Sequence, residues 1–106
     1  MEISPNDLAA KLKRGEPVWL LDVRNPWEHD LVRLPDQALI PLPELPERLD
    51  EIRPENGALV VAYCHHGVRS LSAAAILRQA GVRDAVSLAG GIDLWSRAID
   101  PSLPRY

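Results

Sequence analysis

The sequence predicts an α/β protein in which a parallel β-sheet carries helices on both faces. Short, continuously apolar runs such as "VWLLDV" and "ALVVAY" alternate with helical segments of about ten residues, the pattern of successive βαβ units. Apolar residues make up 46% of the chain and charged residues 25%, the balance of a folded globular protein. Because 106 residues is the length of one ordinary domain, we expect a single domain that spans residues 1–106.

The first two predicted elements are a helix and a buried strand. Ser4 precedes Pro5 and stands three residues before Asp7, a typical helix start, so we predict a short helix from there to Gly15. The run "PVWLLDV", residues 17–23, is too short and too apolar for anything but a strand covered on both faces.

Prolines divide the middle of the chain into short elements. Asn25 is a candidate cap for a short helix from Pro26, and "ALI", residues 38–40, is a candidate brief strand. In "PELPERLDEI", residues 43–52, three apolar residues recur at helical spacing. This pattern predicts a second surface helix that ends before Pro54.

Two further strand and helix pairs follow. The run "ALVVAY", residues 58–63, predicts another buried strand. After it, "SLSAAAILRQAG" has the apolar stripe of a helix that begins at or beside Ser70 and stops at Gly81. The last pair is a short strand at "DAVSL", residues 84–88, and a helix at "IDLWSRAI", residues 92–99.

Two expectations concern the tryptophans and the last seven residues. Trp19, Trp27 and Trp95 are expected in the core rather than in a ligand-binding cage. The stretch "DPSLPRY", residues 100–106, contains two prolines and is therefore expected to be extended. The sequence leaves open whether this stretch covers the binding crevice or lies on the back of the molecule.

Composition and charge exclude several classes of partner. With a net charge of -3 and a pI near 5.5, the chain has no basic stripe, so no nucleic-acid partner is expected. Its apolar runs are far shorter than the ~20 residues of a membrane helix and it has no signal-peptide pattern, so we expect no membrane partner and a cytoplasmic location. A lone cysteine excludes an intramolecular disulfide and any CxxC pair.

The candidate site is the stretch "YCHHGVRS", residues 63–70. Cys64 stands at the carboxyl end of the most apolar strand, the edge of a parallel sheet at which ligands bind. Gly67 allows the next residues to curl, so that the amides of residues 65–70 and the amino end of the following helix form a concave ring of donors. A thiolate at the centre of this ring is favoured over the thiol, and Arg69 would reinforce the effect. Cys64 is therefore predicted to be a nucleophile.

Each of these residues also has a plainer interpretation. A free cysteine is often an inert core residue, but the strand-end position of Cys64 and the polar residues after it argue against that. Cys64, His65 and His66 are a candidate metal set, yet three consecutive residues rarely converge on one ion, so no metal and no cofactor are expected. Arg69 is interpreted as an anion ligand, and the alternative is an ion pair with a surface acid.

A second group of polar residues lies around the end of the first long strand. Asp22 and Arg24 are two residues apart, so they face the same side and can brace the neighbouring loops together with Glu28. We interpret these three residues as structural support, and His29 as a solvated helix residue.

Three stretches resemble the rhodanese domain, a family of sulfurtransferases, and in particular its small single-domain bacterial members. "LLDVRNPWEHDLVRLPDQALIPLPELPERL" is similar to the family's strand-helix-strand entry, "VVAYCHHGVRS" to its active-site loop, and "LAGGIDLW" to its closing motif. Residues 32–38, "VRLPDQA", depart from the family's usual glycine-histidine and proline-glycine-alanine pattern. The resemblance covers nearly the whole chain and implies a central parallel sheet of about five strands with helices on both sides.

The resemblance also implies a reaction. The Cys64 thiolate would attack the outer sulfur of a small donor such as thiosulfate, keep that sulfur as a persulfide, and pass it to a thiol, to cyanide or to a protein acceptor. Carried over residue by residue, Cys64 is the catalytic sulfur carrier. The substrate-binding loop consists of His65, His66, Gly67, Val68, Arg69 and Ser70.

Two alternative functions stay open at this point. Rhodanese-like domains also occur as non-catalytic binding or regulatory modules, but those typically lack the cysteine that this chain retains. A cysteine phosphatase or arsenate reductase has a related loop that is one residue longer between cysteine and arginine. Here four residues separate Cys64 from Arg69, and the narrower ring should prefer a single sulfur atom to phosphate.

Overall fold

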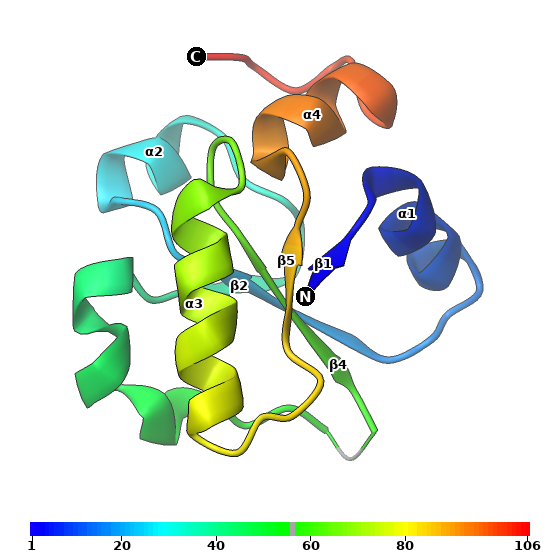
Figure 1. Cartoon of the computed structure of the whole chain (residues 1–106). Helices are drawn as coiled ribbons and strands as arrows, with labels where there is room; N and C mark the ends of the chain where they lie inside the picture. Colours follow the sequence, from blue (N-terminus) through cyan, green and yellow to red (C-terminus); the bar gives the residue numbers. More distant parts are fainter. Residues whose placement is uncertain (56) are drawn as a thin grey trace.

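The computed structural model describes residues 1–55 and 57–106, which form an open five-stranded sheet (Figure 1). All neighbouring strands are parallel, and their order across the sheet is β1-β5-β4-β2-β3. The strands are β1 (Glu2–Ile3), β2 (Val18–Asp22), β3 (Gln37–Leu39), β4 (Leu59–Tyr63) and β5 (Val86–Leu88). Because β4 is the middle strand, the loop that follows it lies at the centre of the edge formed by the carboxyl ends.

Helices cover both faces of this sheet, which confirms the predicted fold class (Figure 1). Helix α1 (Pro5–Lys13) and helix α4 (Gly91–Ala98) pack on one face, and helix α3 (Val68–Gln79) packs on the other. The short helix α2 (Pro26–Leu31) follows the carboxyl end of β2. Within the described ranges 1–55 and 57–106, no helix is both long enough and apolar enough to cross a bilayer.

The apolar runs form strands because both faces of the sheet are buried. Along β4, Leu59, Val61 and Tyr63 contact the core under α1 and α4. Val60 and Ala62 alternate with them and contact the core under α3. Successive strand residues point to opposite faces, so a strand covered on both sides needs apolar residues at every position.

The helix predicted for residues 43–52 is wrong. This segment forms two 3₁₀ helices, η1 (Leu42–Glu47) and η2 (Leu49–Glu51), separated by the non-helical Arg48. Pro46 lies inside η1 and has no amide hydrogen to donate to an α-helical ladder. The apolar residues at helical spacing still reach the core, since Leu45 is completely buried.

Other boundaries differ from expectation by a few residues. The amide of Asp7 donates to Ser4 Oγ at 3.1 Å, which confirms the helix start, and α1 ends at Lys13. Helix α3 begins at Val68, ahead of the expected Ser70, because Gly67 turns the chain directly into it. The two-residue strand β1 is too short to leave a periodic signal in the sequence.

The tryptophans and the last residues also correct two expectations. Trp95 is buried and Trp19 packs against the α3 side of the core, but Trp27 is 60% exposed and lies outside the core. Trp27 stands in the first turn of α2, which has only six residues, and its side chain lies on the solvent side of this helix. Residues 100–106 contain a turn at Pro101 and Ser102, so they are not extended throughout.

Candidate active site

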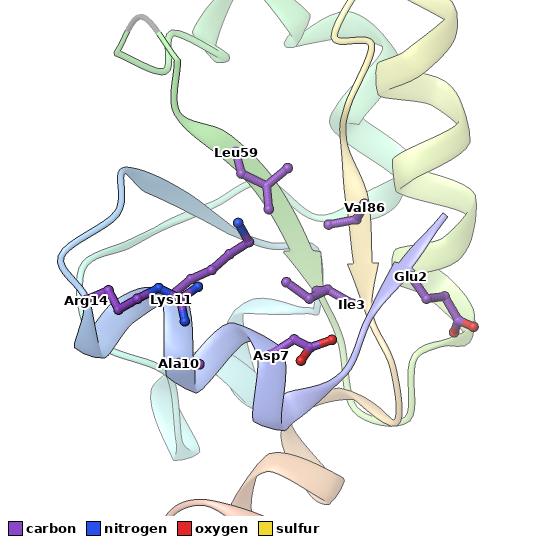
Figure 2. A pocket seen from close by; sticks show the side chains of 8 residues that line it. All are labelled: Glu2, Ile3, Asp7, Ala10, Lys11, Arg14, Leu59 and Val86. Carbon is purple, nitrogen blue, oxygen red and sulfur yellow. The ribbon is translucent and has the colours of Figure 1, made fainter.

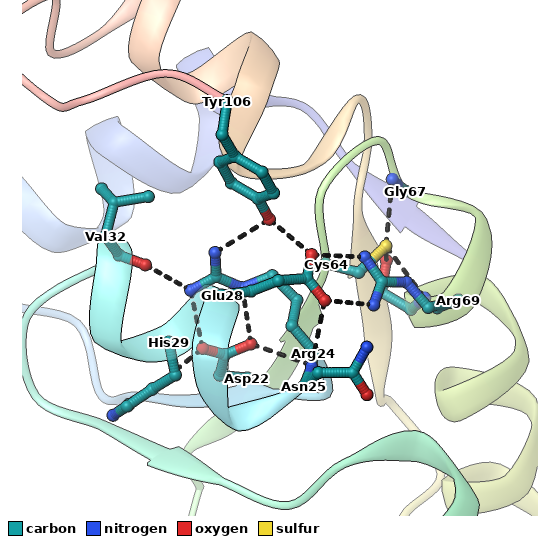
Figure 3. A network of polar contacts seen from close by, with 11 residues as sticks. Asp22, Arg24, Asn25, Glu28, His29, Val32, Cys64, Gly67, Arg69 and Tyr106 are labelled. Carbon is teal, nitrogen blue, oxygen red and sulfur yellow. Dashed lines mark hydrogen bonds and ion pairs between the residues drawn. The ribbon is translucent and has the colours of Figure 1, made fainter.

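The sulfur of Cys64 lies within a group of hydrogen-bond donors at the carboxyl end of β4 (Figure 3). The amide of Gly67 donates to Cys64 Sγ at 3.1 Å, and the amide of Ser70 donates to it at 3.3 Å. Ser70 Oγ lies 3.4 Å from the same sulfur. Cys64 is only 1% exposed. Donors aimed at one sulfur stabilise negative charge there. The arrangement therefore suits a Cys64 thiolate, or a negatively charged sulfur atom attached to Cys64 Sγ.

The loop can turn this tightly because of Gly67. Its φ of 97° lies in the left-handed region that favours glycine. A Cβ at this position would lie 3.0 Å from the amide nitrogen of Gly90 and 3.3 Å from the carbonyl oxygen of Leu88. Glycine is therefore favoured at position 67 for two reasons, the left-handed backbone conformation and the close approach of the neighbouring loop.

The first turn of α4 fixes the same loop from the other side. The amides of Ile92 and Asp93 donate to the carbonyl oxygens of Cys64 and His65 at 2.8 and 3.1 Å. At Gly91, with φ of 62°, an added Cβ would lie 2.3 Å from the His65 carbonyl oxygen and 2.5 Å from that of Cys64. Gly91 in "LAGGIDLW" therefore allows the two backbones to meet.

Ser87 is a site residue that sequence reasoning missed. Its hydroxyl lies 2.7 Å from that of Ser70, and both residues are completely buried. This contact links β5 to the first turn of α3 and keeps Ser70 beside Cys64. The available signal was a serine inside the apolar run "AVSL", but the sequence does not show which partner it meets.

Arg69 binds a buried acid. Its guanidinium donates to both carboxylate oxygens of Glu28, with distances of 2.7 and 2.8 Å. Hydrogen bonds from Arg69, and lesser ones from Tyr106 and the Asn25 amide, outweigh the opposing effect of burial and lower the pKa of Glu28 to about 2. The structure thus shows the ion pair considered as the alternative for Arg69, with a buried acid in place of a surface one. Binding of an anion by Arg69 stays a prediction.

Asp22 and Arg24 form a completely buried pair behind Glu28 (Figure 3). Arg24 donates to Asp22 through its backbone amide and through its Nε and Nη2, at distances from 2.8 to 3.0 Å. It also donates to the Val32 carbonyl oxygen at 2.5 Å, which ties the end of α2 to the end of β2. Burial lowers the pKa of Arg24, but hydrogen bonds to Asp22 and Tyr106 raise it more, so the guanidinium stays charged.

His29 is not the solvated helix residue that the sequence suggested. Its Nδ1 lies 3.0 Å from Asp22 Oδ2, and its side chain is 17% exposed. Asp22 is the last residue of β2 and α2 begins four residues later, so the Asp22 carboxylate is within reach of His29.

Residues 100–106 end on the site side of the molecule, because Tyr106 contacts Glu28, Arg24 and His65. Its hydroxyl donates to Glu28 Oε2 at 2.6 Å and accepts from Arg24 Nη1 at 3.0 Å (Figure 3). Its ring stacks on His65 with centroids 3.8 Å apart, and it meets the Trp27 ring edge to face at 5.8 Å. Burial, and then the hydrogen bond to Glu28, raise the pKa of Tyr106 to about 12. No feature of the sequence singled out this residue.

The side chains of the loop point in different directions. His65 is half-buried, and burial, together with the adjacent His66, lowers its pKa, so the ring is neutral at neutral pH. The His66 side chain is 63% exposed, with Nδ1 at 3.8 Å from Asp93 Oδ2. Val68 is 76% exposed. The donors that reach Cys64 Sγ are therefore backbone amides of the loop and helix, with the Ser70 hydroxyl beside them.

A hollow elsewhere on the molecule belongs to a different region. It has a volume of about 330 Å³, lies beside α1, and includes Leu59 and Val86 at the amino ends of β4 and β5 (Figure 2). Cys64 follows the opposite end of β4, so this hollow is not part of the site. Among residues 1–55 and 57–106, no three His, Cys, Asp or Glu side chains form a group that could hold a metal ion.

Comparison with known proteins gives one family. The rhodanese-like domain family matches residues 4–98. The probable adenylyltransferase/sulfurtransferase MoeZ of Mycobacterium tuberculosis is 39% identical over 106 residues, covering 98% of this chain and 26% of MoeZ, so the chain spans about a quarter of that relative's length. A sulfurtransferase of Allochromatium vinosum is 38% identical over 96 residues, covering 91% of this chain and 88% of the relative.

A solved structure agrees with these sequence matches. The rhodanese-like domain protein of Staphylococcus aureus superimposes with a TM-score of 0.81 and 30% identity, covering 99% of this chain and 97% of that one. Fold and sequence therefore agree. The chain belongs to the rhodanese-like domain family.

Proposed function

We propose that the protein is a sulfurtransferase in which Cys64 carries sulfane sulfur as a persulfide. The observation that carries this proposal is the pair of amides, from Gly67 and Ser70, that donate to Cys64 Sγ at 3.1 and 3.3 Å. Donors placed there favour the thiolate needed for attack. The relatives named as sulfurtransferases support the same reaction class.

The proposed reaction has two displacement steps. With thiosulfate as donor, the Cys64 thiolate attacks the outer sulfur, a new S–S bond forms, and the old S–S bond breaks with its electron pair leaving on sulfite. An acceptor nucleophile then attacks the terminal sulfur of the persulfide and takes it, and the Cys64 thiolate leaves. Charge and atoms balance in both steps, and neither needs a cofactor.

The acceptor must come from outside the chain. Cys64 is the single cysteine of the sequence, so no second thiol is available to discharge the persulfide within it. We propose a thiol, cyanide or a protein as acceptor and thiosulfate or a similar small molecule as donor. The cytoplasmic location stays a prediction from the sequence.

Intact-mass measurement tests the proposal. After incubation with thiosulfate and removal of the excess, the protein is expected to gain the mass of one sulfur atom, and cyanide is expected to remove it with release of thiocyanate. Cys64→Ser should show no gain. A wild-type protein that stays at its original mass would contradict the proposal, and phosphate release from an aryl phosphate would favour a phosphatase instead.

A further inference from the structure

We infer that Tyr106 is a positioning residue for the binding of an anionic sulfur donor. In this inference, which rests on the proposed function, Arg69 leaves Glu28 to bind the donor, and the Tyr106 hydroxyl holds the Glu28 carboxylate in place while Arg69 is away. The contacts of Glu28, Tyr106 and Arg69 each support this exchange.

The Glu28 carboxylate has donors that remain when Arg69 leaves. Oε1 accepts from the Asn25 amide at 3.1 Å as well as from Arg69, and Oε2 accepts from Tyr106 Oη at 2.6 Å as well as from Arg69. Each oxygen therefore keeps one partner. Glu28 is 3% exposed, and a buried carboxylate that lost all its donors would be strongly destabilised. Tyr106 lowers the cost of the exchange.

The hydroxyl of Tyr106 can act in this way because its orientation is fixed. Arg24 Nη1 donates to Tyr106 Oη at 3.0 Å, so the single hydroxyl hydrogen is directed to Glu28. Arg24 is itself completely buried and bound to Asp22. The stack on His65, with an interplanar angle of 10°, holds the ring over the loop that follows Cys64.

Arg69 is placed to make the exchange. Its side chain is 35% exposed, whereas that of Arg24 is completely buried. It stands in the first turn of α3, one residue before Ser70, whose amide donates to Cys64 Sγ. A planar guanidinium binds two oxygens of a sulfonate group as it binds the two oxygens of a carboxylate. An anionic donor can therefore take the place of Glu28 on Arg69.

Steady-state kinetics of Tyr106→Phe test the inference, because this change keeps the ring and removes the hydroxyl. With thiosulfate as donor and dithiothreitol as acceptor, we expect the KM for thiosulfate to rise roughly fivefold to tenfold, as for loss of a hydrogen bond to a charged group. The kcat and the KM for dithiothreitol should stay near the wild-type values. A merely structural role would not separate the two substrates.

A double variant shows whether Tyr106 acts through Arg69. Arg69→Gln alone should also raise the KM for thiosulfate, and Tyr106→Phe should then add no further increase in the Arg69→Gln background. Ser72→Ala is the control, since it also removes one hydroxyl, and Ser72 is exposed on α3 outside the contacts of Cys64 and Glu28. That variant should keep the wild-type KM for thiosulfate.

The outcomes separate this inference from the proposed function. If the wild-type protein takes up sulfur but Tyr106→Phe keeps the wild-type KM for thiosulfate, the role of Tyr106 is wrong and the sulfurtransferase proposal stands. Additive effects in the double variant would likewise overturn the role of Tyr106. If the wild-type protein takes up no sulfur, both proposals fall.

Discussion

At the scale of single residues, the position of Cys64 depends on contacts from its own loop and from segments that are distant in the sequence. Gly67 and Ser70 donate to the sulfur, Ser87 from β5 holds Ser70, and the backbone beside Gly91 binds the loop carbonyls. Gly91 has the least room of these, because an added Cβ would overlap two carbonyl oxygens. The geometry of the site therefore depends on a residue without a side chain as well as on the nucleophile.

Gly91→Ala is expected to displace the Cys64 loop. Its Cβ would stand 2.3 Å from the His65 carbonyl oxygen, so the two backbones must separate. We expect sulfur uptake to slow about tenfold or more and the free energy of unfolding to fall by about 2 kcal/mol. Mass spectrometry at timed intervals and urea unfolding measure the two effects.

Gly15→Ala is the control for Gly91→Ala. Gly15 also has a positive φ, 73°, but nothing lies within 4 Å of an added Cβ. It should cost about 1 kcal/mol of stability and leave sulfur uptake unchanged. Wild-type uptake by Gly91→Ala would show that the close approach does not position the loop.

At the scale of elements, the helices have separate tasks. The first turn of α3 supplies the Ser70 amide and carries Arg69, while the first turn of α4 binds the loop backbone. Helix α1 lies on the α4 face and contributes the completely buried Leu8 to the core. Weakening α1 should therefore affect stability without affecting the chemistry.

Ser4→Ala tests this division. The change removes the side chain that accepts from the Asp7 amide at the start of α1, so the free energy of unfolding should fall by about 1 kcal/mol. The rate of sulfur uptake should not change. Ser72→Ala, on the exposed side of α3, is the matched serine substitution and should leave stability equal or slightly raised. A loss of uptake in Ser4→Ala would mean that α1 contributes to the site.

At the scale of the whole molecule, an ion pair and hydrogen bonds around Glu28 connect three distant parts of the chain. Glu28 in α2 binds Arg69 in α3, and Tyr106 joins Glu28 to the buried Arg24. Because Glu28 is buried and bound by a cation, its protonation weakens contacts between all three parts. The stability of the protein should therefore depend on pH in the acid range.

The sign follows from the lowered pKa of Glu28. That pKa is about 2 in the folded protein and 4.5 in an ordinary glutamate, so the ionised group stabilises the fold above about pH 4.5. This contribution, on the order of 3 kcal/mol, is lost as the pH falls from about 4.5 through about 2. Urea unfolding over this range should show the decline in wild type.

Glu28→Gln is the control for the pH dependence. It cannot ionise, so its free energy of unfolding should be lower than that of wild type at neutral pH and should decline less steeply in the acid range. Equal slopes for the two proteins would exclude Glu28 as the source.

Much of the fold could be predicted because local patterns reflect burial. The run from Leu59 to Tyr63 is apolar at every position since both faces of β4 are covered, and Ser4 marks the start of α1 by capping it. Residues 43–52 misled because apolar spacing alone does not distinguish an α-helix from 3₁₀ turns that contain proline. Trp27 misled because side-chain type does not fix exposure in a short helix.

By itself, the sequence determined the α/β class with a parallel sheet, the place of Cys64 at the carboxyl end of a buried strand, and the four-residue spacing to Arg69. These are properties of contiguous residues, which local hydrophobicity and glycine positions record. Only the tertiary structure decided that Arg69 binds Glu28, that Ser87 meets Ser70, and that Tyr106 covers the loop. Such contacts join residues 17 to 78 positions apart. No local pattern encodes them, because polar side chains of these types occur throughout the sequence and do not indicate which distant residue they will contact.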